Sequence, residues 1–182
     1  SIGGEIHVAK NGKADFETIN EALNYAYTIE SKENPINIII HNGVYEEVLN
    51  IGGMHNISLI GVNRNHCIIR DDSGLYNNAP VRIEGNSLVK NLTLIATHKD
   101  NPNFEANVGD DYSCSYAIHV DDVHPNDDSQ YLCRIENCYL YSEQNAAIGI
   151  GLQKNQRVEV VNCEIIKNIS DYMYTTHTKA NK

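Results

Sequence analysis

The sequence lacks the signals of several large protein classes. Of its 182 residues none is Trp, two are Phe, and 14 Lys or Arg stand against 24 Asp or Glu, a formal net charge of −10 at pH 7. A chain this acidic repels phosphate backbones, so we expect no nucleic-acid partner. It has no apolar run long enough to cross a membrane and no visible signal peptide. HExxH, GxSxG, P-loop and GxGxxG motifs are also missing.

Cysteine is present, but not in the spacings that bind zinc. The five cysteines are Cys67, Cys114, Cys133, Cys138 and Cys163. An odd number cannot pair completely within one chain. We therefore expect mostly buried thiols, which pack as small hydrophobic side chains.

Two residue types are abundant, with 24 Asn and 22 Ile in the chain. Isoleucine favours β-strands, whereas asparagine favours turns and tolerates left-handed backbone. Together they predict many short strands joined by many turns. Base composition of the genome is the alternative explanation for the same counts.

Hydrophobic periodicity places one helix before a series of strands. Asp15 is the expected N-cap of an amphipathic helix over 16–29. Strands are predicted at 6–9, 36–40, 44–51, 57–60 and 67–69. Since no helix-length segment recurs between the later strands, alternating strand–helix units are excluded and a chain of short strands with bends fits better.

An internal repeat favours a solenoid. Four segments share an Asn followed by alternating apolar residues, beginning at Asn56, Asn91, Asn137 and Asn162. In a parallel β-helix equivalent residues stack from coil to coil. Each Asn is therefore expected at a bend with left-handed backbone, bonding to the Asn one coil on. The cysteines that follow the last two are expected to stack in the core.

The sequence predicts one all-β domain over 1–182. It consists of an N-terminal strand and capping helix (6–30), β-helix coils (36–170) and an inserted polar loop (97–114). The helix is expected to cover the strand edges at the N-terminal opening. Because residues 171–182 show no comparable cap, we expect a module of a larger protein, with an adjacent domain or a homotrimer contacting that end.

The chain resembles the pectin methylesterase branch of the pectin-lyase-like families. The segments that carry the resemblance are 6–12, 15–23, 38–46, 56–61 and 89–94. They contain motifs such as Asp-Phe-x-Thr-Ile-x-Glu-Ala-Leu and Asn-Ile-x-Leu-Ile-Gly. The resemblance implies a right-handed, single-stranded parallel β-helix, and it is good over residues 6–95.

The same resemblance implies a catalytic set that this sequence matches only in part. The family uses an acid/base aspartate, a nucleophilic aspartate, glutamines for the oxyanion and an orienting arginine. Gln144 matches a glutamine, but Asn145 replaces the acid/base aspartate, and an amide cannot transfer that proton. Asp171 is one residue out of register with the nucleophile. An upstream glutamine falls near Cys114, and the tryptophan–arginine motif would lie beyond Lys182. The catalytic candidates are therefore Gln144 and Asp171.

Other candidate residues concern binding. Aromatic rings stack on the apolar faces of sugars, so the carbohydrate-binding candidates are Tyr112, Tyr116, His119, Tyr139 and Tyr141. Ordinary half-buried strand residues are the alternative. Weak candidates for Ca²⁺, which prefers carboxylate oxygens, are Asp110, Asp111, Asp121 and Asp122, with solvated loops as the alternative. Arg82, Arg134 and Arg157 could pair with such acids. No other cofactor is expected.

Three functions are compatible with these features. The first is a non-catalytic module that binds or displays on carbohydrate, in a bacterial surface carbohydrate-active protein or a phage tail or spike protein. The second is a pectinesterase-like carbohydrate esterase or a lyase, and the third is a structural spacer. All three predict an extracellular location, on a bacterial surface or a virion. The first two also predict a polysaccharide or cell-surface glycan as the partner. The net charge of −10 favours neutral sugars over polyanionic pectate.

Overall fold

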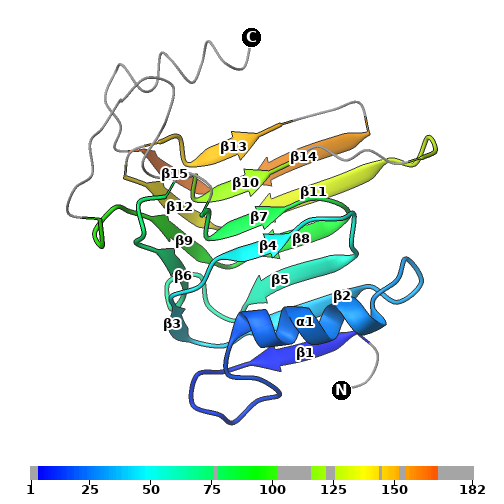
Figure 1. Cartoon of the computed structure of the whole chain (residues 1–182), viewed down its shortest axis with the longest axis horizontal. Helices are drawn as coiled ribbons and strands as arrows, with labels where there is room; N and C mark the ends of the chain where they lie inside the picture. The colour runs from blue at the N-terminus through cyan, green and yellow to red at the C-terminus, as the bar shows by residue number, and fades with distance from the viewer. Residues whose placement is uncertain are drawn as a thin grey trace.

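The computed structural model describes residues 4–75, 78–101, 116–121, 126–143, 145–151 and 155–167, which wind through three parallel sheets (Figure 1). Sheet A runs β1 (Glu5–Val8), β2 (Ile36–Ile40), β5 (Ile57–Gly61), β8 (Ser87–Lys90), β11 (Tyr131–Glu136) and β14 (Gln156–Val161). Sheet B runs β3 (Gly43–Tyr45), β6 (Cys67–Asp71), β9 (Thr93–Ala96), β12 (Tyr139–Ser142) and β15 (Glu164–Lys167). Sheet C runs β4 (Leu49–Ile51), β7 (Val81–Ile83), β10 (Ile118–Val120) and β13 (Ile148–Ile150).

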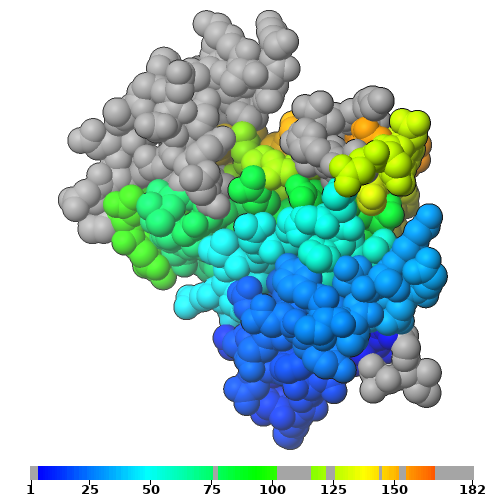
Figure 2. All heavy atoms as spheres, turned by 45° about the vertical axis from the view of Figure 1, so that its right-hand side comes forward, coloured from blue at the N-terminus to red at the C-terminus, as the bar shows by residue number. Residues whose placement is uncertain are grey.

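From β2 onward the chain visits the sheets in the order A, B, C, and every strand pairs in parallel with the strand one coil away. The register is direct, as when Ile36 pairs with Ile57 and Ile118 pairs with both Val81 and Ile148. Consecutive coils therefore stack from the N-terminal end of the chain upward, as the colour gradient in Figure 2 shows. The repeat of short strands and bends is confirmed as a parallel β-helix.

Alternate residues of each strand point into one continuous core. In β2 the side chains of Ile36, Ile38 and Ile40 are fully buried, while Asn37 between them is exposed. Burying one such isoleucine stabilises the fold by roughly 1.5–3 kcal/mol. The abundance of isoleucine is therefore explained in part by the inward positions of the stacked strands.

The single helix among the described residues, α1 (Ile19–Ile29), begins three residues later than the predicted start at residue 16. Thr18 is the N-cap, because its hydroxyl accepts the backbone N–H of Glu21. The expectation for Asp15 was wrong: its carboxylate accepts the N–H of His7 at 2.8 Å and so ties the preceding loop to β1. Glu47 accepts the N–H groups of Ile19 and Asn20, each at 2.9 Å, and satisfies donors that no helix turn can reach.

The helix packs on β1 and β2 at the N-terminal end of the stack, as Figure 1 shows. Its buried face consists of Ile19, Ala22, Leu23 and Ala26, which join the core cluster. The predicted capping role of the helix is confirmed by this packing.

The predicted strand over 44–51 is instead two strands. β3 ends at Tyr45 in sheet B, and β4 begins at Leu49 in sheet C. Between them the chain turns a corner of the coil, where the N–H of Glu47 donates to the carbonyl of Tyr45 at 3.0 Å. The buried residues Tyr45, Leu49 and Ile51 are separated by even numbers of positions, so the alternation of inward residues keeps its phase across the corner and the sequence alone does not reveal the bend.

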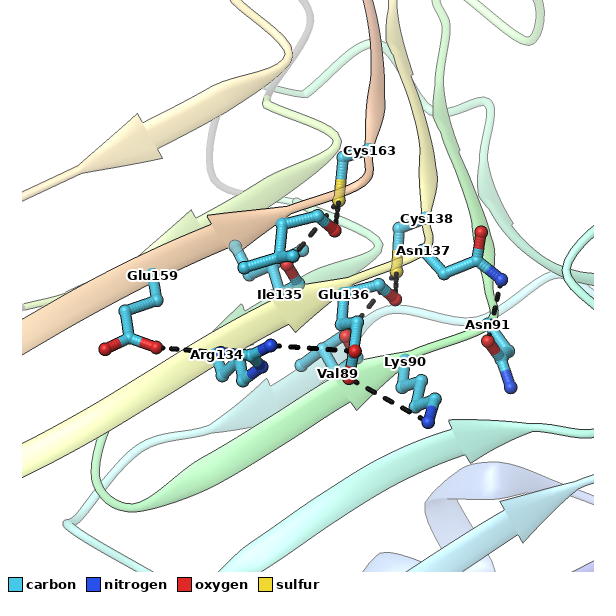
Figure 3. Close-up of polar contacts among 11 residues, drawn as sticks. Val89, Lys90, Asn91, Arg134, Ile135, Glu136, Asn137, Cys138, Glu159 and Cys163 are labelled. Carbon is cyan, nitrogen blue, oxygen red and sulfur yellow. Dashed lines mark hydrogen bonds and ion pairs between the residues drawn. The ribbon is translucent and has the colours of Figure 1, made fainter.

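Three of the four repeated asparagines form the predicted bends between sheets A and B. Asn91, Asn137 and Asn162 have φ values of 57°, 50° and 53°. The side-chain amide of Asn137 donates to that of Asn91 at 2.9 Å, one coil away (Figure 3). Asn56 does not share this place: it precedes β5 in sheet A, and its amide donates to Glu30. For that residue the ladder prediction was wrong.

The cysteines behave as predicted wherever the structure describes them. Cys67, Cys133 and Cys138 are buried, Cys163 is partly exposed, and none of these four is in a disulfide. The backbone N–H of Glu164 donates to the carbonyl of Cys138 at 2.9 Å, which places Cys163 one coil above Cys138 (Figure 3). Cys114 lies outside the described residues.

The domain boundaries stay predictions, because most of the inserted loop and all of 168–182 lie outside the described residues. Within the part of the chain that the structure covers, no helix has the length and apolar character needed to cross a membrane.

Candidate functional site

The outer face of sheet C carries one row of side chains in register. Asn50 pairs with Arg82, Arg82 with His119, and His119 with Gly149 on successive strands. The flanking residues of β10, Ile118 and Val120, are fully buried, so His119 points outward as its alternation predicted. The β-helix register thus brings together residues that are separated by 30 to 37 positions in sequence.

Within this row His119, Asp121 and Arg82 form a chain of charged contacts. His119 Nε2 lies 3.1 Å from Asp121 Oδ1, and Arg82 Nε donates to Asp121 Oδ2 at 2.5 Å. The side chain of Asp121 is 18% exposed and that of His119 is 25% exposed. A carboxylate held on both oxygens in this way orients the imidazole.

Tyr116 closes one side of the row. Its ring centroid lies 5.1 Å from that of His119 with the planes tilted by 54°. The ring also lies over Gly149, where an added Cβ would come within 2.3 Å of it. Tyr116 is only 5% exposed, so it packs against one side of the row and does not present an open ring face to a sugar.

The turn that joins β12 to β13 lies beside this row, one coil further on. Asn145 is buried, its backbone N–H donates to Ser142 Oγ at 3.1 Å, and its side-chain oxygen accepts the N–H of Ala146 at 2.8 Å. The carbonyl of Ala147 accepts the N–H of Ala117 at 2.9 Å, which ties the turn to the strand carrying His119. The catalytic candidates Gln144 and Asp171 lie outside the described residues.

On the other side of the same turn, the outer face of sheet B forms a groove of about 400 Å³. We call it the tyrosine groove, and it is lined by Arg70, Ile95, Thr97, Lys99, Tyr139, Tyr141 and Glu143. Tyr139 and Tyr141 alternate with the buried Leu140 on β12. Tyr141 stands in register with Ile95, and Ile95 with Arg70. Two of the predicted carbohydrate-binding tyrosines therefore line one groove, whereas Tyr112 lies outside the described residues.

Polar contacts fix the edge of the tyrosine groove. Arg70 Nε donates to both oxygens of Asp72, at 2.9 and 2.7 Å, and the hydroxyl of Thr97 donates to Asp72 Oδ1. Burial acts to raise the pKa of Asp72, but these hydrogen bonds outweigh it and leave the pKa below its usual value. Burial raises the pKa of the neighbouring Asp71.

A second ion pair holds the start of the turn. Glu143 accepts the backbone N–H of His98 at 3.0 Å, and its other oxygen lies 3.2 Å from His98 Nε2. The wall of the groove at Glu143 is thus fixed to the coil below. The Arg70–Asp72 pair and the Glu143–His98 pair were not predicted from the sequence. Arg70 could have been found, because it occupies an outward position on a strand whose residues alternate between buried and partly exposed.

The remaining sequence candidates have other partners. Asp121 is engaged by Arg82 and His119, and its proposed companions Asp110, Asp111 and Asp122 lie outside the described residues. Across the residues that the structure covers, no group of three acids, histidines or cysteines is placed to hold a metal ion. Arg134 and Arg157 both pair with Glu159, at 2.9 and 3.0 Å (Figure 3 shows the first pair).

Comparison with known proteins agrees with this architecture. The family model for pectinesterase matches residues 5–132, so the chain belongs to the pectinesterase family. A pectinesterase/pectinesterase inhibitor of Ficus pumila var. awkeotsang is 30% identical over 95 residues, which cover 48% of this chain and 17% of that protein.

Solved structures show the same fold. The pectin methylesterase PemA from Erwinia chrysanthemi superposes with a TM-score of 0.61 at 22% identity, covering 90% of this chain and 49% of that one. A pectin methylesterase mutant in complex with a hexasaccharide gives a TM-score of 0.60 at 21% identity, covering 90% of this chain and 49% of that one. The predicted fold class and family resemblance are confirmed. The chain spans about half the length of these structures.

Proposed function

We propose that this protein acts on polysaccharide as a carbohydrate esterase of the pectinesterase type, with the glycan lying in the tyrosine groove. Membership of the pectinesterase family favours this function over the non-catalytic module that was the first hypothesis from the sequence. A related pectin methylesterase has been solved with a hexasaccharide, which is consistent with a glycan partner here.

The observation that carries the proposal is the tyrosine groove itself. Tyr139 and Tyr141 project from one strand into it, and Glu143 begins the turn that leads to Asn145. Aromatic faces bind the C–H surfaces of sugar rings while hydroxyl and carboxylate groups bind their hydroxyls. A glycan in this groove would therefore reach the turn where the family places its acid/base group.

The groove carries charges of both signs. Arg70 is neutralised by Asp72, whereas Lys99 and Glu143 add one charge each to the lining. Local charge is therefore balanced even though the whole chain carries −10. Partly esterified and neutral glycans are the substrates that such a lining suits. Secretion to a bacterial surface or virion, and a trimer, stay predictions from the sequence.

The test combines turnover with binding. We expect the protein to release methanol or acetate from methylated pectins or acetylated glycans. Tyr139→Ala and Tyr141→Ala should each weaken oligosaccharide binding about tenfold, which corresponds to about 1.4 kcal/mol. Tyr25→Ala is the matched control, because Tyr25 is 50% exposed and lies on α1, which does not line the tyrosine groove. Unchanged binding by both groove variants would contradict the assignment.

A non-catalytic glycan-binding module is the second candidate, and Asn145 favours it. An amide at the position of the acid/base aspartate cannot move a proton, and this one is buried and used within its turn. The module predicts binding without product release by the native protein. Release that requires the Asn145→Asp replacement would support the module and contradict the esterase.

A further inference from the structure

We infer that Cys138 and Cys163 are the site of a reversible disulfide, which low-molecular-weight aliphatic disulfides such as oxidised glutathione install. The thiol of Cys163 receives the reagent, and the thiol of Cys138 completes the bond between the two coils. The structure describes both cysteines in the reduced form. The site does not depend on the proposed esterase function, because it arises from the stacking of two coils.

The strand register places the two cysteines directly one above the other. β11 pairs with β14 before them and β12 pairs with β15 after them, with the same offset of 25 residues on both sides. Cys138 and Cys163 have this offset too. Hydrogen-bonded strands lie about 4.8 Å apart, and the Cα atoms of a disulfide usually lie about 4.4–6.8 Å apart. The backbone therefore already has the spacing that a bond between these two residues needs.

No other pair of the described cysteines has this spacing. Cys67 belongs to the same column of stacked residues, but the buried Leu92 separates it from Cys138. Two strand spacings make about 9.6 Å between Cα atoms, beyond the limit of about 7 Å for a disulfide. Cys133 lies within β11, and the residues in register with it on β8 and β14 are a serine and a valine.

The two thiols also have equivalent surroundings. Cys138 Sγ lies 3.5 Å from the carbonyl oxygen of Val89, and Cys163 Sγ lies 3.5 Å from that of Ile135. Val89 and Ile135 are themselves in register on adjacent strands. The two side chains therefore point the same way from stacked positions, as Figure 3 shows. Rotation about their χ1 bonds, without a shift of either strand, turns the sulfurs toward each other.

Cys163 is the thiol that a reagent reaches first. It is partly exposed, whereas Cys138 is buried. The neighbouring thiol of Cys138 lowers the pKa of Cys163, and the guanidinium of Arg64 acts in the same direction. Arg64 is held 3.2 Å from the carboxylate of Glu164, the residue that follows Cys163. Thiols that are accessible and close to a guanidinium are the ones that attack disulfides readily.

The exchange balances in two steps. The thiolate of Cys163 attacks one sulfur of the reagent, the S–S bond of the reagent breaks, and the released thiolate takes up the proton that Cys163 lost. Cys138 Sγ then attacks Cys163 Sγ, the mixed disulfide breaks, and the second reagent thiol leaves with the proton of Cys138. Two protein thiols are oxidised and one reagent disulfide is reduced to two thiols. An excess of a reducing thiol reverses both steps.

The bond would close the coil that carries the tyrosine groove. Cys138 precedes β12 and Cys163 precedes β15, so the closed loop contains β12, β13 and β14. A disulfide that closes a loop of about 25 residues stabilises a protein mainly by restricting its unfolded chain. The oxidised protein should therefore unfold at a higher temperature than the reduced protein.

The experiment treats the reduced full chain with oxidised glutathione and maps its peptides by mass spectrometry without reduction. We expect peptides joined through Cys138 and Cys163, and an unfolding temperature roughly 5–10 °C above that of the reduced chain. In Cys138→Ala the glutathione should stay on Cys163 as a mixed disulfide, because no thiol is stacked there to release it. Cys133→Ala is the matched control, since it removes another buried thiol and should keep both the linkage and the temperature shift.

The peptide map of the native protein decides the outcome even if a variant fails to fold. Peptides joined through Cys138 and Cys163, separated again by dithiothreitol, support the site. A native protein that keeps glutathione on Cys163, or whose Cys163 stays unmodified, would overturn it. Linkage of Cys163 to Cys114 or to a second chain would do the same. The esterase function is tested by product release alone, so either result here leaves it unaffected.

Discussion

The first and last described coils place isoleucine at the same kind of inward position but bury it to different degrees. Ile38 in β2 is fully buried and lies between β1 and β5 in sheet A. Ile165 in β15 stands in register with the buried Leu140, yet it is 52% exposed. Val160 in β14, in register with the buried Ile135, is 39% exposed.

This difference shows that an inward position becomes core only when another layer covers it. Stability in a solenoid is a sum of coils and of the interfaces between neighbours. The first coil has α1 and β1 on one side and β5 on the other. The segments that carry the family resemblance lie at residues 6–94, whereas the catalytic candidates Gln144 and Asp171 were predicted further along the chain.

The largest expected effect compares the same substitution at the two ends. Ile38→Ala should lower the free energy of unfolding by about 2–5 kcal/mol, because it leaves a cavity among side chains that are covered on every side. Ile165→Ala should cost less than about 1 kcal/mol, since half of that side chain already contacts solvent. Urea unfolding measures both. Equal losses at the two positions would show that the last coil is covered as well as the first.

Most of the fold could be predicted from the sequence, because its two abundant residue types occupy distinct structural positions. Isoleucine at alternate positions marked β2 and β5, and asparagine with left-handed backbone marked the bends at Asn91, Asn137 and Asn162. Asn56 was wrongly grouped with the other three asparagines, because the sequence pattern does not show which corner of a coil a residue occupies.

The site was less predictable for a related reason. Tyr139 and Tyr141 were found because they alternate on one strand. Arg82 and Asp121 are 39 positions apart, and their pairing depends on the register between β7 and β10. Coil lengths vary, so that register is fixed only by the packing of the whole stack.

An intermediate effect is expected from two adjacent aspartates with opposite pKa shifts. The pKa of Asp72 lies below its usual value, so its contribution to stability is present above about pH 3.9, the pKa of an unfolded aspartate, and is lost as pH falls through the lower folded value. Asp72→Asn should therefore cost about 1–2 kcal/mol at pH 7 and progressively less towards pH 3.

Asp71→Asn is the matched control. Burial raises the pKa of Asp71, so ionising it at neutral pH opposes folding, and the amide should be neutral or stabilising at pH 7. The amide oxygen can still accept the N–H and hydroxyl of Ser73, which the carboxylate accepts now. Urea unfolding at pH 7 and pH 3 compares the two variants. A destabilisation of the same size in both, independent of pH, would contradict the assigned shifts.

The smallest effect concerns the reactivity of the thiols. The neighbouring thiol of Cys138 lowers the pKa of Cys163, and the same interaction raises the pKa of Cys138. Cys163 is also partly exposed, whereas Cys67, Cys133 and Cys138 are buried. Iodoacetamide at pH 7 should therefore modify Cys163 well before those three, because the thiolate is the reactive form.

Peptide mass spectrometry over a time course reads the order of modification. In Cys138→Ala the thiolate of Cys163 loses this neighbour, and its labelling at pH 7 should slow. The slowing should be smaller at pH 9, where a thiol of ordinary pKa is already ionised to a large extent. A rate at pH 7 that is unaffected by Cys138→Ala would mean that exposure alone makes Cys163 reactive. The last coil would then differ from the first only in how much of it is covered, and not in the chemistry of its stacked side chains.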